Sequence, residues 1–141
     1  MSDRTFAIIK PDAIKNNFTK KIYNHILDAG FKVLNEKLIK MSKDQAEGFY
    51  AIHKGKPFFN ELISFMSSGQ CMVLALQKAS AVSSWRETIG ATNPADADEG
   101  TIRNLYATSL GENAVHGSDS DENAKKEIAF FFSDAELITN N

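Results

Sequence analysis

Apolar and polar residues follow two different periods along this chain, and the change from one period to the other predicts its secondary structure. Nearly continuous apolar runs at residues 5–10 and 71–76 predict strands, and Pro11 is expected to end the first because it cannot continue a ladder. The second run is apolar enough for a central strand that is buried on both faces. A run at 31–41 with interspersed lysines predicts a third strand, and the short segment 115–116 predicts a fourth.

Helical spacing of apolar residues occurs between these strands. Ser42, followed three residues later by Gln45, forms the pattern of a capping box and predicts a further helix that begins at Lys43. The segment 90–100 is rich in Gly, Pro, Asn and Asp and is expected to be an irregular loop. The segments with helical spacing are 22–27, 58–66, 79–89 and about 120–132.

The order of these elements predicts the class of fold. Strands and helices alternate, which suits an α+β or α/β sandwich in which helices cover a four-stranded sheet. Periodicity alone leaves the order of the strands open. The 141 residues contain no internal repeat, low-complexity tract or linker, so residues 1–141 are expected to form a single domain.

Composition and charge narrow the classes of function. A formal net charge of -2 gives no reason to expect nucleic acid or an anionic membrane as a partner, so any attraction for phosphates must come from local groups. The single Cys71 lies in an apolar run and is expected to be a buried, unreactive thiol. No secretory leader precedes the first strand, and no apolar stretch approaches the roughly 20 residues of a membrane span, so a cytoplasmic location is expected.

The segment 113–120 carries the most informative candidate chemistry. His116 ends a short apolar run, and Gly117 is expected to leave space beside the imidazole because it has no Cβ. Asp119 and Ser120 are expected to form the N-cap and first turn of the last helix, whose free N–H groups favour anions. A neutral imidazole beside such a helix start is typical of a phosphate-accepting nucleophile. The alternative is a strand, a turn and a capped helix with an incidental histidine.

Glu127 is a candidate partner for this histidine. It lies seven residues after Ser120 and therefore projects from the same side of the last helix. A carboxylate there can hold one imidazole nitrogen of His116 and leave the other free to attack. The alternative is a solvated glutamate paired with Lys125 or Lys126.

Four further positions suit a nucleotide. Lys10 at the end of the first strand can neutralise a phosphate, and Arg86 and Arg103 flank the loop that contains Thr92. Phe58 at the start of a helix can stack on a nucleobase. The alternatives are a lysine that caps a strand edge, two surface arginines and an aromatic ring that only packs.

Other kinds of site lack their motifs. The sequence contains neither a Walker A loop nor Gly-x-Gly-x-x-Gly, so a bound nucleotide would be held by side chains and metal. The acidic segment 96–99 lacks the ligand spacing of an EF-hand and is expected to be a solvated loop. The three histidines and Cys71 lack the spacing of zinc ligands. No metal site made of protein ligands is expected.

Five blocks of residues occur over nearly the whole chain, from about Arg4 to Phe132. They are Lys10-Pro11-Asp12-Ala13, Lys56-Pro57-Phe58-Phe59, Gly90-Ala91-Thr92-Asn93-Pro94-Ala95, Gly100-Thr101-Ile102-Arg103 and Asn113-x-x-His116-Gly117-Ser118-Asp119-Ser120. In their order and spacing they resemble the nucleoside diphosphate kinase family, in its bacterial-type short form.

The resemblance implies both a fold and an activity. The fold is an α+β, ferredoxin-like βαββαβ sandwich, in which helices cover a four-stranded antiparallel sheet. In the activity, His116 takes the γ-phosphoryl group of a nucleoside triphosphate, with ATP as main donor, and passes it to a nucleoside diphosphate in a ping-pong reaction. Broad tolerance of base and sugar, Mg²⁺ bridging the phosphates, and a homo-oligomer (a tetramer or hexamer built from dimers) are also implied.

Roles are carried over residue by residue. The catalytic group consists of His116 as nucleophile with Lys10, Tyr50, Ser118 and Glu127, of which Ser118 and Glu127 support His116. Phe58 stacks on the base, and Leu62 and Leu110 line the same cleft. The residues that contact phosphates, ribose or the surroundings of the nucleophile are Lys10, Tyr50, Arg86, Thr92, Arg103 and Asn113.

Two segments depart from the family's pattern. Residues 16–21 replace a segment that usually holds glycines, and Asn17 is expected to adopt a positive φ in place of glycine. Gln70 and Gln77-Lys78 also differ, which bears on oligomer contacts or on the geometry of the sheet edge and not on the chemistry.

Two other functions remain possible for the same residues. A non-enzymatic nucleotide-binding module would bind nucleotide without phosphoryl exchange. An interaction protein would pass a phosphoryl group from His116 to protein partners, which requires a docking surface.

Overall fold

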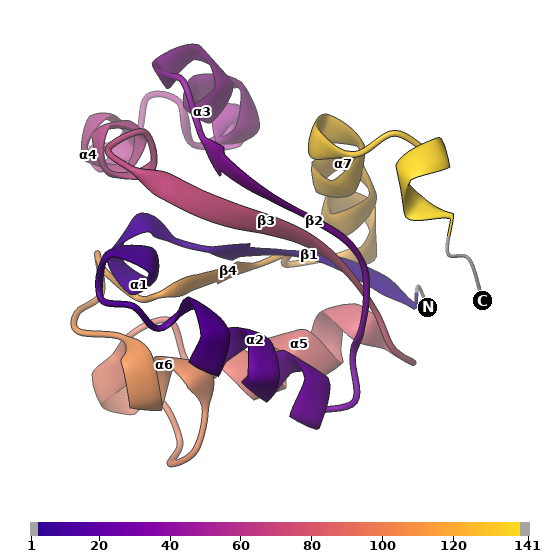
Figure 1. Cartoon of the computed structure of the whole chain (residues 1–141). Coiled ribbons are helices and arrows are strands. Elements are labelled where there is room, and N and C mark those ends of the chain that lie inside the picture. The colour runs from indigo at the N-terminus through magenta and orange to yellow at the C-terminus, as the bar shows by residue number, and fades with distance from the viewer. Residues whose placement is uncertain (1–2, 139–141) are drawn as a thin grey trace.

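The computed structural model describes residues 3–138, and its centre is a four-stranded antiparallel sheet (Figure 1). The order of the strands is β2-β3-β1-β4, and every neighbouring pair is antiparallel. This confirms the expected α+β class and fixes the strand order that periodicity left open. The strands are β1 (Arg4–Ile9), β2 (Lys32–Lys40), β3 (Gln70–Gln77) and β4 (Val115–Gly117).

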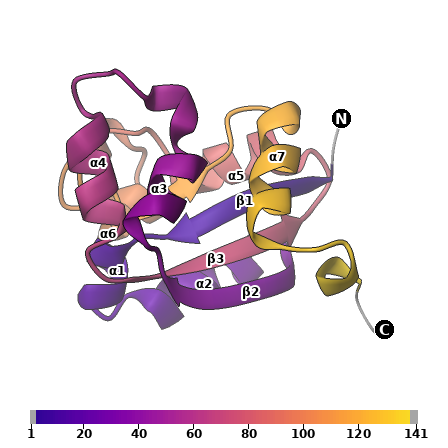
Figure 2. The ribbon, with the colours of Figure 1, turned by 90° about the horizontal axis from the view of Figure 1, so that it is seen from above.

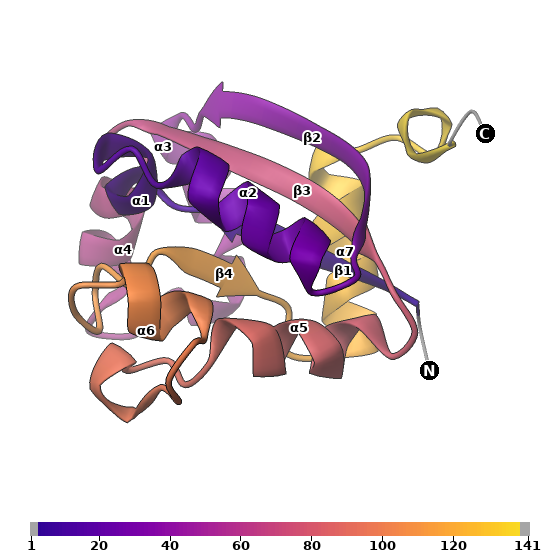
Figure 3. The same cartoon turned by 60° about the horizontal axis from the view of Figure 1, so that its bottom comes forward.

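Helices cover both faces of the sheet. Figure 2 shows α3, α4 and α7 over β1 and β3, and Figure 3 shows α2, α5 and α6 on the opposite face. The first group is α3 (Lys43–Phe49), α4 (Phe59–Met66) and α7 (Asp121–Phe131); the second is α2 (Thr19–Asp28), α5 (Ala81–Ile89) and α6 (Ile102–Tyr106), with α1 (Pro11–Lys15) beside it.

Two apolar cores result, one on each side of the sheet. Alternate residues of β1 point to opposite faces, so Phe6 and Ile8 enter one core while Ala7 and Ile9 enter the other. The strand β3 is divided in the same way, which confirms that residues 71–76 form a central strand buried on both faces. The polar side chains discussed below lie where β1 and β4 meet the loops at their ends.

Within residues 3–138, the sequence analysis missed two α-helices, α1 and α6, and the 3₁₀ turns at Ala51–His53 and Ala135–Leu137. Each of α1 and α6 has five residues, which is too short for helical periodicity to be seen. Pro11 occupies the first turn of α1, where its missing N–H is no loss, and the Thr101 side chain caps α6 by accepting the Asn104 N–H. The expected irregular loop 90–100 also contains a 3₁₀ turn at Pro94–Asp96.

Several local expectations are confirmed. The capping box of α3 is present, with Ser42 Oγ accepting the Gln45 N–H at 3.0 Å and Gln45 Oε1 accepting the Ser42 N–H at 3.0 Å. Asn17 has a φ of +63°. Cys71 is buried, and burial raises the pKa of its thiol to about 11, so it is unreactive near neutral pH. Within residues 3–138, no helix is long and apolar enough to cross a membrane.

Candidate active site

His116 lies on β4, the short strand at one edge of the sheet. The ladder pairs it with Ile8 of β1, and its imidazole faces the core that contains Phe6. Ring centroids of Phe49 and Tyr50 lie 5.5 and 6.3 Å from that of His116. The side chain keeps 18% of its surface exposed, so the ring is oriented by packing yet open to solvent.

Glu127 and Ser118 hold one nitrogen of the His116 ring. Glu127 Oε1 lies 2.7 Å from His116 Nε2 and also accepts a hydrogen bond from Ser118 Oγ at 2.8 Å. A carboxylate only accepts, so Nε2 carries the proton and Nδ1 carries the lone pair. None of the hydrogen bonds among the described residues involves Nδ1. Lys126 pairs with Glu122 at 3.2 Å and not with Glu127.

Gly117 does not leave space beside the imidazole, and that expectation was wrong. Successive strand residues point to opposite faces, so the missing side chain of Gly117 lies on the face opposite His116. A Cβ there would lie 2.9 Å from Trp85 Cδ1 and 3.0 Å from Ile89 Cδ1. The glycine therefore admits the indole of Trp85, whose Nε1 donates to the His116 carbonyl oxygen at 3.1 Å.

The start of α7 is capped nearly as expected. Ser120 is the N-cap, and its Oγ accepts the Asn123 N–H at 3.1 Å. Asp119 lies one residue before the cap and outside the first turn, where its Oδ1 accepts from Asn123 Nδ2 at 2.6 Å. That hydrogen bond, with a smaller effect from Arg86, lowers the pKa of Asp119.

Lys10 and Asn113 form a buried polar pair beside the His116 strand. Lys10 Nζ donates to Asn113 Oδ1 at 2.8 Å, and Asn113 Nδ2 donates to the Thr92 carbonyl oxygen at 3.3 Å. Burial, and then the positive charge of Arg103, lowers the pKa of Lys10 to about 8. The structure thus brings together the end of β1, the segment before β4 and the Thr92 loop.

Arg103 forms hydrogen bonds with the backbone around the Lys10–Asn113 pair. Its guanidinium donates to the carbonyl oxygens of Val115 at 2.9 Å, Gly90 at 3.0 Å and Asn113 at 3.4 Å. Burial, and then the charge of Arg86, lowers its pKa to about 10. Three of the five guanidinium N–H groups are therefore used on the protein, and two remain for a ligand.

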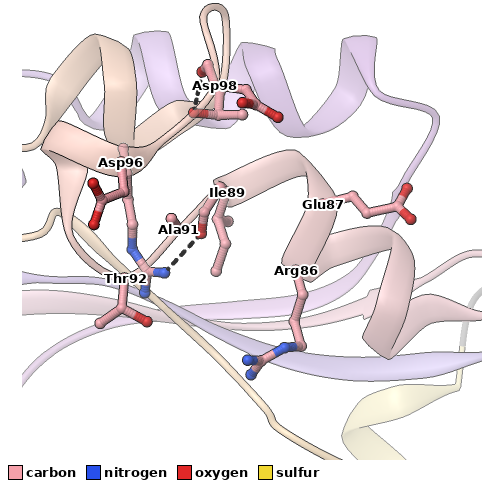
Figure 4. A pocket seen from close by; sticks show the side chains of 10 residues that line it. Arg86, Glu87, Ile89, Ala91, Thr92, Asp96 and Asp98 are labelled. Carbon is pink, nitrogen blue, oxygen red and sulfur yellow. Dashed lines mark hydrogen bonds between the residues drawn. The ribbon is translucent and has the colours of Figure 1, made fainter.

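A pocket of about 370 Å³ opens between α5 and the loop that follows it (Figure 4). Arg86, Thr92 and Arg103 line it, together with Asp96 and Asp98. In Figure 4 the side chain of Glu87 points away from Thr92 and Asp96. Two guanidinium groups and a hydroxyl on one pocket suit phosphate oxygens.

A row of aromatic rings connects His116 to the outer part of the site. Ring centroids are 6.3 Å apart from His116 to Tyr50, 6.3 Å from Tyr50 to His53 and 5.5 Å from His53 to Phe58. Tyr50 is buried, and its hydroxyl has no hydrogen-bond partner within the described part of the chain; burial raises its pKa strongly. Phe58 is 47% exposed, so one face of its ring is accessible to a ligand.

The two leucines expected near the base differ in exposure. Leu62 on α4 is partly buried against the core that contains Phe6. Leu110 lies in the segment before β4 and is 60% exposed. Phe58 and Leu110 are therefore both exposed, whereas Leu62 is packed against the core.

Metal-binding side chains are sparse. Residues 3–138 contain no group of three or more His, Cys, Asp or Glu side chains arranged to hold a metal ion. The pocket supplies the carboxylates of Asp96 and Asp98. Such a donor set fits a magnesium ion that keeps its waters and is held mainly by phosphate oxygens.

Sequence reasoning missed three residues that shape this site. Asp12 binds the backbone before His116, Trp85 binds the His116 carbonyl, and His53 lies between Tyr50 and Phe58. Asp12 falls inside a quoted motif block, which is the one signal that pointed to it. Trp85 has no local signal, because its partner His116 is 31 residues away. His53 lies within five residues of both Tyr50 and Phe58, but no motif marks it.

A comparison with protein families gives one match along nearly the whole chain. The model of the family described as nucleoside diphosphate kinase matches residues 3–137. A nucleoside diphosphate kinase of Geotalea uraniireducens is 54% identical over 136 residues, covering 96% of this chain and 99% of the relative. One of Phenylobacterium zucineum is 55% identical over 138 residues, covering 98% and 99%.

Solved structures agree with the sequence relatives. The nucleoside diphosphate kinase of Aquifex aeolicus superposes with a TM-score of 0.94 at 37% identity, covering 96% of this chain and 99% of that one. That of Halobacterium salinarum, solved in complex with CDP, superposes with a TM-score of 0.93 at 36% identity, covering 100% and 94%.

Proposed function

The chain belongs to the nucleoside diphosphate kinase family, and on that premise we propose that it transfers phosphoryl groups between nucleotides through a phosphohistidine on His116. Family membership supports nucleotide phosphotransfer as the activity. The observation that carries the histidine mechanism is the imidazole held at Nε2 by Glu127, while Nδ1 has no hydrogen bond among the described residues and 18% of the side chain is exposed.

The proposed reaction has two half-steps. In the first, the lone pair of His116 Nδ1 attacks the γ-phosphorus of a nucleoside triphosphate; an N–P bond forms, and the bond to the β–γ bridging oxygen breaks. The nucleoside diphosphate leaves with that electron pair. In the second, a terminal β-phosphate oxygen of an incoming nucleoside diphosphate attacks the same phosphorus, and the N–P bond breaks. Glu127 stabilises the positive charge that develops on the ring during each step.

The cationic groups of the site suit the charge of the phosphates. Lys10, Arg86 and the two unused N–H groups of Arg103 would neutralise phosphate oxygens, with the Thr92 hydroxyl as a further donor. Asn113 orients the Lys10 ammonium, and Ser118 orients Glu127. When bound with the nucleotide, Mg²⁺ would supply further neutralisation of phosphate charge, and Asp96 and Asp98, which line the pocket, are the side chains that would hold it.

The outer part of the site favours broad tolerance of bases. Stacking on Phe58 uses the π-face that every base has, and Leu62 and Leu110 add only apolar contact. The ring of Tyr50 packs against the imidazole of His116 and would help to keep this nucleophile in position. The relative from Halobacterium salinarum was solved with CDP, a pyrimidine nucleotide, which agrees with a site that is not restricted to purines.

A coupled transfer assay tests this function. In three separate reactions, the protein is incubated with ATP together with GDP, CDP or dTDP. The nucleoside triphosphate formed from each acceptor is then measured. We expect all three to be made at similar rates, and His116→Asn to make none. Nucleotide affinity without any exchange would instead identify a non-enzymatic binding module.

The proposal also covers the oligomeric state of the protein, its location in the cell and the extent of its domain. We propose a homo-oligomer, a tetramer or hexamer built from dimers, whose mass light scattering would give. The edge strand β2 and its exposed Leu38 offer a surface for pairing. The nucleotides it uses are those of the cytoplasm, where we place the protein. Residues 1–141 form one kinase domain in this proposal.

A further inference from the structure

The backbone just before His116 is held in an unusual conformation. Ala114 has a φ of +71°, in the left-handed region that residues with a Cβ rarely adopt. The Val115 N–H donates to the Asn113 carbonyl oxygen at 2.8 Å, which closes a three-residue γ-turn around Ala114. A γ-turn with positive φ is strained, so other contacts must hold this one in place.

Both polar groups of the Ala114 backbone are bound by the segment that follows β1. Its N–H donates to Asp12 Oδ2 at 3.0 Å, and its carbonyl oxygen accepts from the Lys10 N–H at 2.8 Å. Ala114 is completely buried and Asp12 nearly so. Water therefore has little access to either group, and these two hydrogen bonds determine the local conformation.

The Asp12 carboxylate is costly to bury. Burial raises its pKa, against the opposing effects of the Ala114 N–H and of Lys10. Its Oδ1 has no hydrogen-bond partner among residues 3–138. The backbone N–H groups of Asp12 and Ala13, in the first turn of α1, also favour the charged form. The carboxylate thus joins the start of α1 to the turn before β4, and this position points to the geometry that it enforces.

We propose that Asp12 is a positioning residue that acts on the reaction through the turn at Ala114. With the turn held, the Asn113 side chain meets Lys10 Nζ at 2.8 Å, and His116 pairs in register with Ile8 of β1. Without this turn, the Lys10–Asn113 pair and His116 are no longer held in fixed positions relative to each other. This inference rests on the proposed role of His116.

Asp12 also acts on Lys10 through its charge. The charged groups that face Lys10 are Asp12 on α1 and Arg103 on α6, and Arg103 in turn faces Arg86 on α5. Burial and Arg103 lower the pKa of Lys10, and Asp12 raises it. Loss of the carboxylate charge is therefore expected to lower that pKa further, so that the ammonium is lost at a lower pH.

Three variants separate these effects. Asp12→Asn keeps the shape and one acceptor oxygen but removes the charge, and Asp12→Ala removes both. Ala114→Gly lets the turn adopt its positive φ without a Cβ, and it is combined with Asp12→Ala. Asp44→Asn is the matched control, because Asp44 holds the same second position in α3 but is exposed.

The measurements are kcat and KM for transfer from ATP to dTDP, the pH profile of kcat/KM, and the unfolding temperature. We expect Asp12→Ala to lower kcat about tenfold or more, with a smaller loss when Ala114→Gly is present. We expect Asp12→Asn to move the alkaline limb of kcat/KM down by about one pH unit. Asp44→Asn should match the wild type in all of these.

Two results would overturn the inference. One is an equal loss of kcat from Asp12→Ala with alanine and with glycine at position 114. The other is an unchanged pH profile in Asp12→Asn, whose fold is checked first by its unfolding temperature. A wild-type protein that transfers no phosphoryl group would instead overturn the proposed function, so the two failures are told apart by the wild-type assay.

Discussion

The inner and outer ends of the candidate site are built on different principles. At the inner end, Lys10 and Asn113 are buried and His116 is largely so, and partners at 2.7–2.8 Å fix the side chains. At the outer end, Phe58 and Leu110 are exposed and offer only apolar surface. One end has a fixed set of charges and hydrogen bonds, and the other has an open surface.

This difference matches what varies between nucleotides and what does not. All nucleoside triphosphates carry the same triphosphate group, so side chains in fixed positions at the inner end can bind every one of them equally well. Bases and sugars differ, and a half-exposed ring can stack on any of them. The comparison predicts large losses of rate from changes at the inner end and smaller losses of binding from changes at the outer end.

The largest effect is expected from Lys10→Met, which breaks the inner end. The substitution keeps the length of the side chain but removes the ammonium and leaves Asn113 Oδ1 unpaired. We expect kcat/KM for ATP and dTDP to fall by about 10²- to 10³-fold, as for loss of one charge-stabilising donor. Lys15→Met, at the exposed end of α1, is the control and should be unchanged. A loss of less than about threefold in Lys10→Met would mean that phosphates bind elsewhere.

The next effect is expected from Glu127→Gln, which keeps the shape of the inner end but removes its negative charge. Without the carboxylate, positive charge on the His116 ring is less stabilised during each half-step, so kcat should fall by about tenfold to a hundredfold. KM should change little, because Glu127 contacts His116 and Ser118 and not the pocket. Glu122→Gln on the same helix is the control. An unchanged kcat would show that the ring needs no carboxylate.

A smaller effect is expected from pH alone. Lys10 is charged below its pKa of about 8 and neutral above it, and only the charged form attracts phosphates. The value of kcat/KM should therefore fall about tenfold per unit as pH rises beyond 8, and Lys10→Met should lack this limb. The ratio of rates for different bases should stay constant, because Phe58 does not titrate. A limb that persists in Lys10→Met would assign it to another group.

The smallest effect is expected from Phe58→Ala, which breaks the outer end. Loss of stacking is worth about 1–3 kcal/mol, so KM for ATP should rise about tenfold while kcat stays within about twofold. Leu27→Ala, at the same 47% exposure on α2, is the control. If kcat fell with KM unchanged, the outer end would be part of the chemistry and the contrast between the two ends would be lost.

The sequence was most informative where structure follows from neighbours along the chain. Periodicity and capping predicted β3, α3 and α7, because a buried strand or a capped helix leaves a signal within about ten residues. The family resemblance added the antiparallel fold and the residues around His116. The positive φ of Asn17 was predicted from the family's glycines in this segment, because asparagine tolerates positive φ better than most residues.

What the sequence could not predict depends on distant contacts. Asp12 meets the Ala114 N–H across 102 positions, and the indole of Trp85 fills the space that Gly117 leaves. The role of Gly117 was misassigned because its neighbour in space was unknown. The strain at Ala114 has no sequence signal, since Gly, Asn and Asp are the residues that indicate a positive φ and alanine is not one of them.

Labelling with a donor alone tests the central claim most directly. The protein is incubated with γ-labelled ATP without any acceptor, and bound label is measured after acid and after base. We expect stoichiometric label on the wild type that is stable in base and lost in acid, released by added dTDP, and absent from His116→Asn. Equal labelling of His116→Asn, or label that survives acid, would contradict a phosphohistidine at this position.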